Sequence, residues 1–226
     1  MCIDLVGRAE SVLPDLLNLA LALSLSLRGY QILHAAGICV AGRCAAILGA
    51  SGSGKSSMVL AAARLGASIV SDEIVPFRDE DGALVVPGGN PRIRVAAPLL
   101  DRDELRTLGA RPGRGRKIEV DLNRLGLPCT ATPSRLSLLI LLGNRLGARA
   151  PRVRPKRLAP VDAFGSILNS AFNNRMLTVH ERESQFQIDA RVVRELPCYL
   201  LSVREGVGNA SAAARWVVEE LERSGV

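Results

Sequence analysis

The spacing of apolar residues predicts alternating helices and short strands in the first third of the chain. Over residues 10–28, leucines recur at steps of three and four, which is typical of a helix with one buried face. Residues 32–39 and 43–48 are apolar runs that predict two strands, with a turn at Ala41-Gly42 between them. A second helix is expected over residues 55–65, because apolar positions again follow helical spacing.

The rest of the chain shows the same alternation with longer polar interruptions. Further strands are expected at 67–70, 118–120, 137–142 and 200–203, helices at 98–109, 161–172 and 210–223, a hairpin turn at Asp81-Gly82, and arginine-rich loops at 111–117 and 148–160. This order of elements predicts an α/β fold. We expect a single domain over residues 1–226, with a helical lead-in at 1–30 and the core at 31–226.

The composition fits a folded protein and limits the classes of binding partner that we expect. Hydrophobic residues make up 48% and charged residues 23%, which excludes collagen-like and largely disordered classes. Aromatic residues amount to only 3%, so a surface that stacks on nucleobases has little to be built from, and nucleic acid is not an expected partner. The net charge of +7 is compatible with a phosphate-rich ligand or an anionic surface, and equally with solvated arginines.

The cysteines and the apolar segments predict a cytoplasmic protein without a membrane partner. The chain has five cysteines and no C-x-x-C pair, which indicates neither a disulfide framework nor a zinc site. The most apolar stretch, Leu13 to Leu27, contains Pro14 and Asp15 and falls short of the roughly 20 residues that span a bilayer.

The strongest chemical motif is GASGSGKS, which matches the phosphate-loop pattern G-x-x-x-x-G-K-[ST] in full. Glycines let successive N–H groups point at phosphate oxygens, and the helix that follows adds its positive end. In this pattern Lys55 reaches the terminal phosphates and the Ser56 hydroxyl ligates Mg²⁺. The expected nucleotide-binding residues are Gly49, Ala50, Ser51, Gly52, Ser53, Gly54, Lys55, Ser56 and Ser57. An ordinary glycine-rich turn would explain the glycines but not Lys55.

An acidic pair, Asp72-Glu73, ends the strand that follows the phosphate-loop helix. A right-handed β-α-β crossover brings the carboxyl ends of its two parallel strands to the same edge of the sheet, so we expect both carboxylates near the γ-phosphate. One can hold the Mg²⁺ shell while the other orients a hydroxyl for in-line attack. The alternative is a plain strand-exit turn.

Three other residues are candidates for the same site. His34 precedes the phosphate loop among apolar neighbours, where a packed core histidine is the alternative. Arg92 and Arg94 alternate along an extended segment, so they share one face and can meet phosphate oxygens, unless both are simply solvated.

The segment from Leu33 to Phe77, LHAAGICVAGRCAAILGASGSGKSSMVLAAARLGASIVSDEIVPF, resembles the HPr kinase/phosphorylase family, including the short HPr-kinase-like serine kinases of modified-peptide gene clusters. Fainter likeness continues through residues 90–100, 116–120 and 137–142. The resemblance implies a fold related to phosphoenolpyruvate carboxykinases, with a mixed central sheet flanked by helices. It also implies Mg²⁺-ATP as donor, a serine hydroxyl of a protein or peptide as acceptor, and a homo-oligomer that shorter members need not form.

The same resemblance assigns roles to residues of this chain. Asp72 would be the catalytic base, Ser56 and Glu73 would bind the metal, Lys55 would hold the phosphates, and His34 would line the pocket. The chain departs from the family where Glu73 replaces a second aspartate, where Ala50 replaces an acid, and where PRIR replaces an EIRG-like segment. These departures favour a serine substrate other than HPr itself.

The leading hypothesis is therefore an ATP-dependent serine kinase. A second hypothesis is an ATP-binding and ATP-hydrolysing switch module that acts on a protein partner without phosphorylating it. A nucleic-acid-binding protein that uses the arginine-rich loops is a third. The absence of an LSGGQ segment argues against a transporter ATPase.

Overall fold

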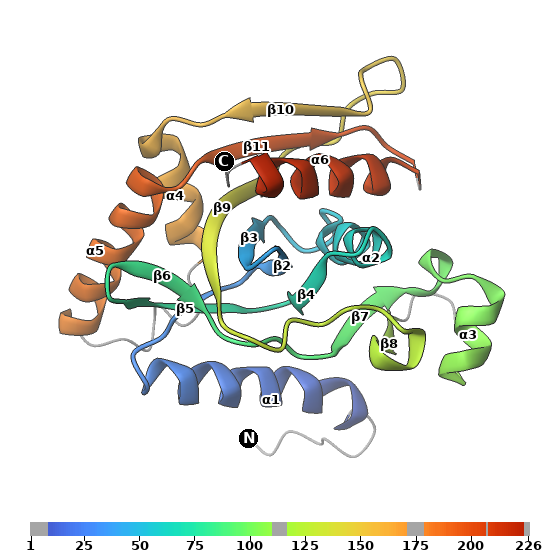
Figure 1. Ribbon diagram of the computed structural model, residues 1–226, viewed down its shortest axis with the longest axis horizontal. Coiled ribbons are helices and arrows are strands. Elements are labelled where there is room, and N and C mark those ends of the chain that lie inside the picture. The colour runs from blue at the N-terminus through green and yellow to red at the C-terminus, as the bar shows by residue number, and fades with distance from the viewer. Residues whose placement is uncertain (1–8, 110–116, 171–178, 207, 224–226) are drawn as a thin grey trace, which may run out of the picture.

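A strongly curved mixed sheet forms the centre of the computed structural model, which describes residues 9–109, 117–170, 179–206 and 208–223 (Figure 1). Within these residues the sheet consists of β1 Gln31–Leu33, β2 Ala36–Val40, β3 Arg43–Leu48, β4 Ser68–Ser71, β5 Val75–Glu80, β6 Ala83–Val86, β9 Ser134–Leu142, β10 Val153–Arg157 and β11 Cys198–Val203. A separate antiparallel ribbon pairs β7 Arg92–Ala96 with β8 Lys117–Asp121.

The long strand β9 organises the sheet. One edge of β9 pairs in parallel with β3, and the other is shared by β6 at its start and by the parallel strand β11 at its end. Beyond β3 come β2 and then β4, both pairings antiparallel. The strand β4 therefore runs in the same direction as β3, with β2 between them.

Helices cover both faces of the sheet (Figure 1). They are α1 Ala9–Ser26, α2 Lys55–Arg64, α3 Arg102–Leu108, α4 Pro160–Ser170, α5 Val179–Glu195 and α6 Asn209–Arg223, with short 3₁₀ turns η1 Ala97–Leu99 and η2 Asn123–Leu125. Alternation along β3 divides the core, since Ala45 and Ile47 pack in the cluster under α2 and α6, whereas Ala46 and Leu48 pack in the cluster that includes residues of α4 and α5.

Most elements predicted near the phosphate loop are confirmed. The first two helices and the strand at 43–48 agree with the structure within a few residues. Both predicted hairpin turns are present, and each has positive φ at its two central residues: 49° and 76° at Ala41-Gly42, 51° and 83° at Asp81-Gly82. Two left-handed residues give a turn whose twist matches that of the flanking strands.

The strand predicted over residues 32–39 is interrupted. It breaks at His34 and Ala35 into β1, which pairs with β5, and β2, which pairs with β3 and β4. At the break, the His34 N–H donates to the Ser170 carbonyl at 2.7 Å, which lies outside both ladders. The apolar run concealed this change of partner because both halves are buried.

The second half of the chain differs more from the sequence-based picture. The expected loop at 148–160 contains β10, an edge strand paired with β11, and α5 occupies residues for which no element was predicted. The helix expected over 98–109 is shortened to η1 and α3. The basic loop at 111–117 lies outside the described residues except for Lys117, which begins β8.

Two cysteines form a disulfide that the sequence did not indicate. Cys39 and Cys44 are register partners on β2 and β3, and their Cα atoms are 4.1 Å apart. The expectation that the cysteines form no disulfide was wrong, because the hairpin register brings the two sulfur atoms together. Cys129 and Cys198 are free.

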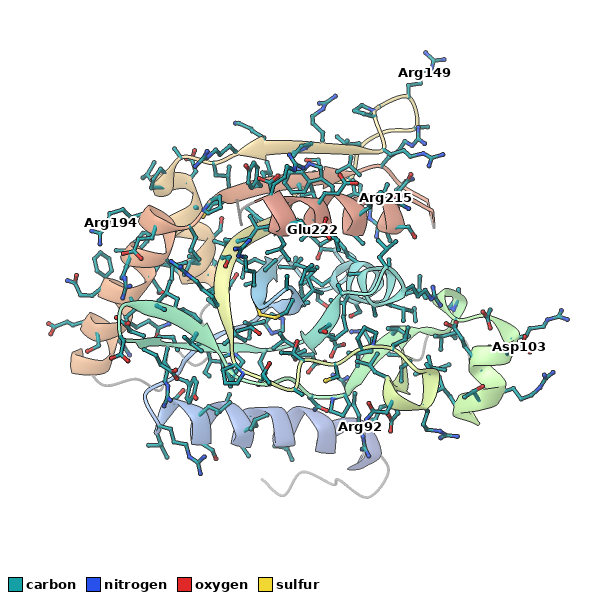
Figure 2. The ribbon with its side chains drawn as sticks, viewed as in Figure 1. Arg92, Asp103, Arg149, Arg194, Arg215 and Glu222 are labelled. Carbon is teal, nitrogen blue, oxygen red and sulfur yellow. A yellow bond between two sulfur atoms is a disulfide. The ribbon has the colours of Figure 1, made fainter. Side chains whose placement is uncertain are left out.

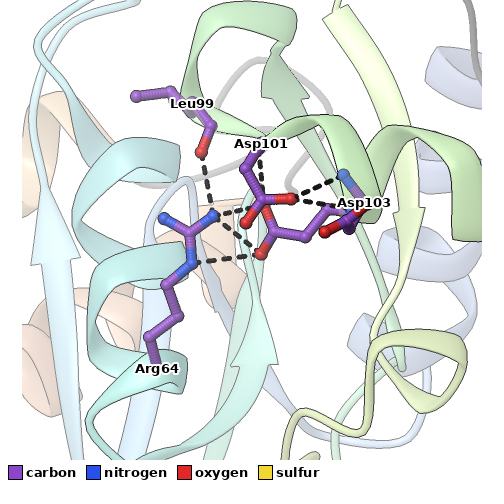
Figure 3. Close-up of polar contacts among 5 residues, drawn as sticks. Arg64, Leu99, Asp101 and Asp103 are labelled. Atoms are coloured by element: carbon purple, nitrogen blue, oxygen red, sulfur yellow. Dashed lines mark hydrogen bonds and ion pairs between the residues drawn. The ribbon is translucent and has the colours of Figure 1, made fainter.

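A polar cluster fastens α2 to the segment before α3 (Figure 3). Arg64 donates to the Glu104 carboxylate, with Nη2 2.6 Å from Oε2, and to the Leu99 carbonyl at 2.9 Å. The Asp101 side chain caps α3, and the Glu104 side chain accepts the Asp101 N–H in return. Leu99 therefore has a fixed position relative to the phosphate-loop helix.

The core contains one carboxyl group that the fold does not satisfy. Asp189 of α5 is 0% exposed, and neither of its carboxylate oxygens has a hydrogen-bond partner among the described residues. Desolvation raises the pKa of Asp189 to about 7. Because the folded state binds this proton more tightly than the unfolded chain does, stability falls as pH rises from about 4 to about 7.

Replacing Asp189 should therefore stabilise the protein in a pH-dependent way. We expect Asp189→Asn to raise the free energy of unfolding at pH 8 by on the order of 2–4 kcal/mol and to change it little at pH 4. Urea denaturation at both pH values measures the difference. Asp103→Asn, at an exposed position on α3, is the control. An equal effect at the two pH values would contradict a buried carboxyl with a raised pKa.

Candidate functional site

The ends of several strands meet at one edge of the sheet and border a cleft. The strand β3 leads into Gly49, β4 ends before Asp72, and β9 ends before Gly143. Since β4 and β9 run in the direction of β3, their carboxyl ends share this edge. The cleft measures about 350 Å³ and is lined by His34, Ala50, Ser51, Gly52, Gly54, Lys55, Ser56, Ser57, Asp72, Glu73, Arg94, Ala96, Leu99, Lys117 and Arg145.

The loop Gly49–Ser56 curls between β3 and α2 so that its backbone borders the cleft. Gly52 and Gly54 have φ values of 79° and 107°, which a side chain would strain. Gly54 is the N-cap of α2 and supplies no side-chain cap. The first N–H groups of the helix therefore remain available to an anion, and a phosphate group suits them.

Lys55 lies over this loop and is almost fully buried. Its Nζ donates to the Gly49 carbonyl at 2.6 Å and to the Ala50 carbonyl at 3.3 Å. Desolvation, followed by the positive charge of Lys117, lowers the pKa of Lys55. A phosphate oxygen can replace either carbonyl as the acceptor of this amine, which is the role that the motif predicts.

Asp72 joins the phosphate-loop helix to the β7–β8 ribbon. Its Oδ2 accepts the Arg94 backbone N–H at 2.9 Å and lies 3.5 Å from the Ser56 Oγ. The residue is 7% exposed, and this desolvation raises the pKa of Asp72, although the Arg94 N–H acts in the opposite direction. A raised pKa suits a carboxylate that accepts a proton near neutral pH.

Glu73 turns toward a different partner. Its carboxylate forms an ion pair with the Arg94 guanidinium, in which Nε is 3.1 Å from Oε1. The Ser71 hydroxyl accepts the N–H groups of Glu73 and Ile74, both at 3.2 Å, and so shapes the exit from β4. The two adjacent carboxylates therefore have separate environments, one beside Ser56 and one beside Arg94.

His34 lies at the break between β1 and β2, and its side chain is exposed to the cleft rather than packed in the core. Partial desolvation and the positive charge of Lys55 lower the pKa of His34. Because the neutral form is favoured, the ring can accept or donate a hydrogen bond without adding another positive charge beside Lys55.

The oxygen donors around the loop fit a magnesium ion. No cluster of three or more His, Cys, Asp or Glu side chains suitable for a metal occurs in the described ranges. Mg²⁺ in phosphoryl-transfer sites usually takes one or two carboxylates, with substrate phosphates and waters completing the shell. The protein can contribute the Ser56 hydroxyl and the carboxylates of Asp72 and Glu73 as ligands of such an ion.

A second cavity of about 270 Å³ adjoins the cleft. Its walls are mainly aliphatic and come from α2, β9, β11 and α6, with Met58, Leu142, Leu201, Val203 and Ala213 among the lining residues. The two cavities share Gly54, Ser57, Leu99 and Arg145. A nucleoside fits an apolar pocket of this kind when its phosphates occupy the neighbouring loop.

The structure brings most of the predicted residues together. Nearly all of the phosphate loop lines one or both cavities, and the acidic pair and His34 line the same cleft. Of the two candidate arginines, only Arg94 lines it, whereas Arg92 is ion-paired with Glu119. Sequence reasoning missed Lys117 and Arg145. Polar-apolar alternation over 117–121 could have indicated that Lys117 shares the face of its ribbon with Arg94.

Other arginines lie far from the cleft on the molecular surface. Figure 2 shows Arg149 projecting outward beyond β10 and Arg194 projecting from α5.

None of the helices in the described parts of the chain has the length and apolar character needed to cross a bilayer.

Comparison with known proteins shows the fold. No family model matches the sequence, and no curated protein matches it. Among solved structures, the Hpr(Ser) kinase/phosphatase from Coxiella burnetii matches with a TM-score of 0.50 and 15% sequence identity, over 85% of this chain and 92% of that chain. The chain therefore has a mixed α/β fold, with a curled central sheet and flanking helices, that is similar to an HPr kinase.

Filling the second cavity should separate recognition of the nucleoside from recognition of the phosphates. Ala210 lines this cavity at the start of α6 and is partly exposed, so a larger side chain can enter without disrupting the core. We expect Ala210→Phe to weaken Mg-ATP binding about 10-fold and to leave magnesium tripolyphosphate binding unchanged. Isothermal calorimetry measures both.

Ala212→Phe, on the same helix but outside the cavity, is the matched control. If Ala210→Phe bound Mg-ATP as the control does, the nucleoside would have to lie elsewhere.

Proposed function

We propose that the chain is a kinase that transfers the γ-phosphoryl group of Mg-ATP to a serine hydroxyl of a protein or peptide. The observation that carries this proposal is the position of Asp72, a buried carboxylate with a raised pKa beside Ser56 at the start of the phosphate-loop helix. A proton acceptor next to a phosphate-binding loop is what transfer to a hydroxyl requires.

The proposed roles are those that the family resemblance implies, on residues that line the two cavities. The loop amides and Lys55 hold the phosphates, and the second cavity holds the nucleoside. Asp72 accepts the proton of the serine hydroxyl, while Ser56 and Glu73 ligate Mg²⁺. When bound, Mg²⁺ neutralises charge on the phosphate oxygens during transfer. His34 lines the cleft, where its neutral ring can hydrogen-bond the acceptor.

The fold comparison supports a kinase-like, nucleotide-binding role for the chain. The structural neighbour is named an Hpr(Ser) kinase/phosphatase, and the match covers 85% of this chain. A switch ATPase would use the same loop and cleft, so only the fate of the phosphoryl group distinguishes it.

Removing the base should abolish transfer and spare nucleotide binding. We expect Asp72→Asn to lower phosphorylation of a randomised serine-containing peptide library by about 10²- to 10⁴-fold, with Mg-ATP affinity within a few-fold of wild type. Labelled ATP and calorimetry measure the two effects. Lys55→Met should instead remove Mg-ATP binding, and a library with alanine in place of serine should accept no label.

The pH profile of the wild type gives an independent check. Asp72 must be deprotonated to accept the proton, so activity falls as pH drops through its pKa. Because desolvation raises that pKa, the acid limb should lie above pH 4, the region of an ordinary aspartate.

ATP turnover to inorganic phosphate with no labelled peptide would favour the switch module, and an absence of Mg-ATP binding would refute both.

A further inference from the structure

The β7–β8 ribbon presents one polar face to the cleft. Its register pairs Arg94 with Glu119 and Ala96 with Lys117, so these four side chains lie on the same face. The opposite face is apolar, and Ile93, Val95 and Val120 are buried in the core. This alternation directs Lys117 into the cleft, where it shares the lining with Arg94 and Ala96.

Lys117 differs from the other cations of the cleft. Lys55 donates to the loop carbonyls, Arg94 is ion-paired with Glu73, and Arg145 donates to the Gly52 carbonyl at 3.4 Å. The side chain of Lys117 makes no hydrogen bond or ion pair with any residue that the structure describes. A lysine that faces a cleft without an anionic partner has its charge available to a ligand.

The charge of Lys117 acts on three groups of the site. Its positive charge contributes to lowering the pKa values of Lys55 and His34, and it opposes the raised pKa of Asp72. These groups come from α2, from the break after β1 and from the end of β4. Lys117 is exposed and lines the cleft together with His34, Lys55 and Asp72, so its ammonium group can reach a ligand bound beside them.

We propose that Lys117 contacts the γ-phosphoryl group from the ribbon side, opposite Lys55, and so recognises the transferring group itself. This inference rests on the proposed function and adds a residue that the phosphate-loop motif does not contain. During transfer, the bond from Pγ to the β–γ bridging oxygen breaks, the bond from the serine oxygen to Pγ forms, and the serine proton moves to Asp72. Lys117 offsets the negative charge that remains on the phosphoryl oxygens throughout.

A binding experiment tests the contact without an acceptor. We expect Lys117→Met to weaken Mg-ATP binding about 10-fold and to leave Mg-ADP binding within two-fold of wild type, because only the triphosphate carries the group that Lys117 contacts. Lys117→Arg, which keeps the charge, should restore most of the difference. Arg92→Met removes a charge from the same ribbon outside the cleft and should bind both nucleotides as wild type does.

Activity measurements separate this role from contact with the acceptor. If Lys117 contacts the phosphoryl group, Lys117→Met lowers kcat for all serine peptides, whatever the charge of the peptide. An unchanged ratio of Mg-ATP to Mg-ADP affinity, with a higher KM only for peptides with acidic residues, would overturn the proposal and assign Lys117 to the acceptor. Wild-type protein that binds neither nucleotide would instead refute the proposed function.

Discussion

The Asp72 carboxylate connects three parts of the chain that are distant in sequence. It directly follows β4, lies beside Ser56 at the start of α2, and accepts an N–H from the β7–β8 ribbon. These contacts, together with the burial of Ile93, Val95 and Val120 in the core under α2, hold the ribbon beside the phosphate-loop helix and border the cleft. Glu73 adds a second link to the ribbon through Arg94, so the two adjacent acids support the site as well as line it.

Sequence analysis correctly predicted the features that depend on residues close together in the chain. The phosphate loop, its flanking strand and helix, and the hairpin turns depend on residues within a few positions of one another, and they are in the expected places. Asp72 and Glu73 were placed correctly because a crossover connection constrains strand direction, although β2 is inserted between the two parallel strands. The strand order itself could not be derived from an apolar pattern.

Features that depend on distant pairing were missed. The Cys39–Cys44 bond requires the hairpin register, and the position of His34 in the cleft requires a strand to change partners at Ala35. The edge strand β10 consists largely of charged residues with a proline, a composition that predicts a loop. Lys117 was overlooked because its importance comes from the ribbon partner that aligns it with Arg94.

The place of β4 at the end of the strand order has an evolutionary consequence. In the proposed kinase, the phosphate loop follows β3, which has a neighbouring strand on each side, whereas the proposed base Asp72 follows β4, which lies at the end of the strand order. Substitutions at this outer edge that leave Asp72 and Lys117 in place can therefore alter which hydroxyl the proposed kinase admits, while the residues proposed to bind the nucleotide stay unchanged. A lineage with this architecture can therefore acquire new acceptor substrates through changes at the edge of the sheet, while its central strands stay unchanged.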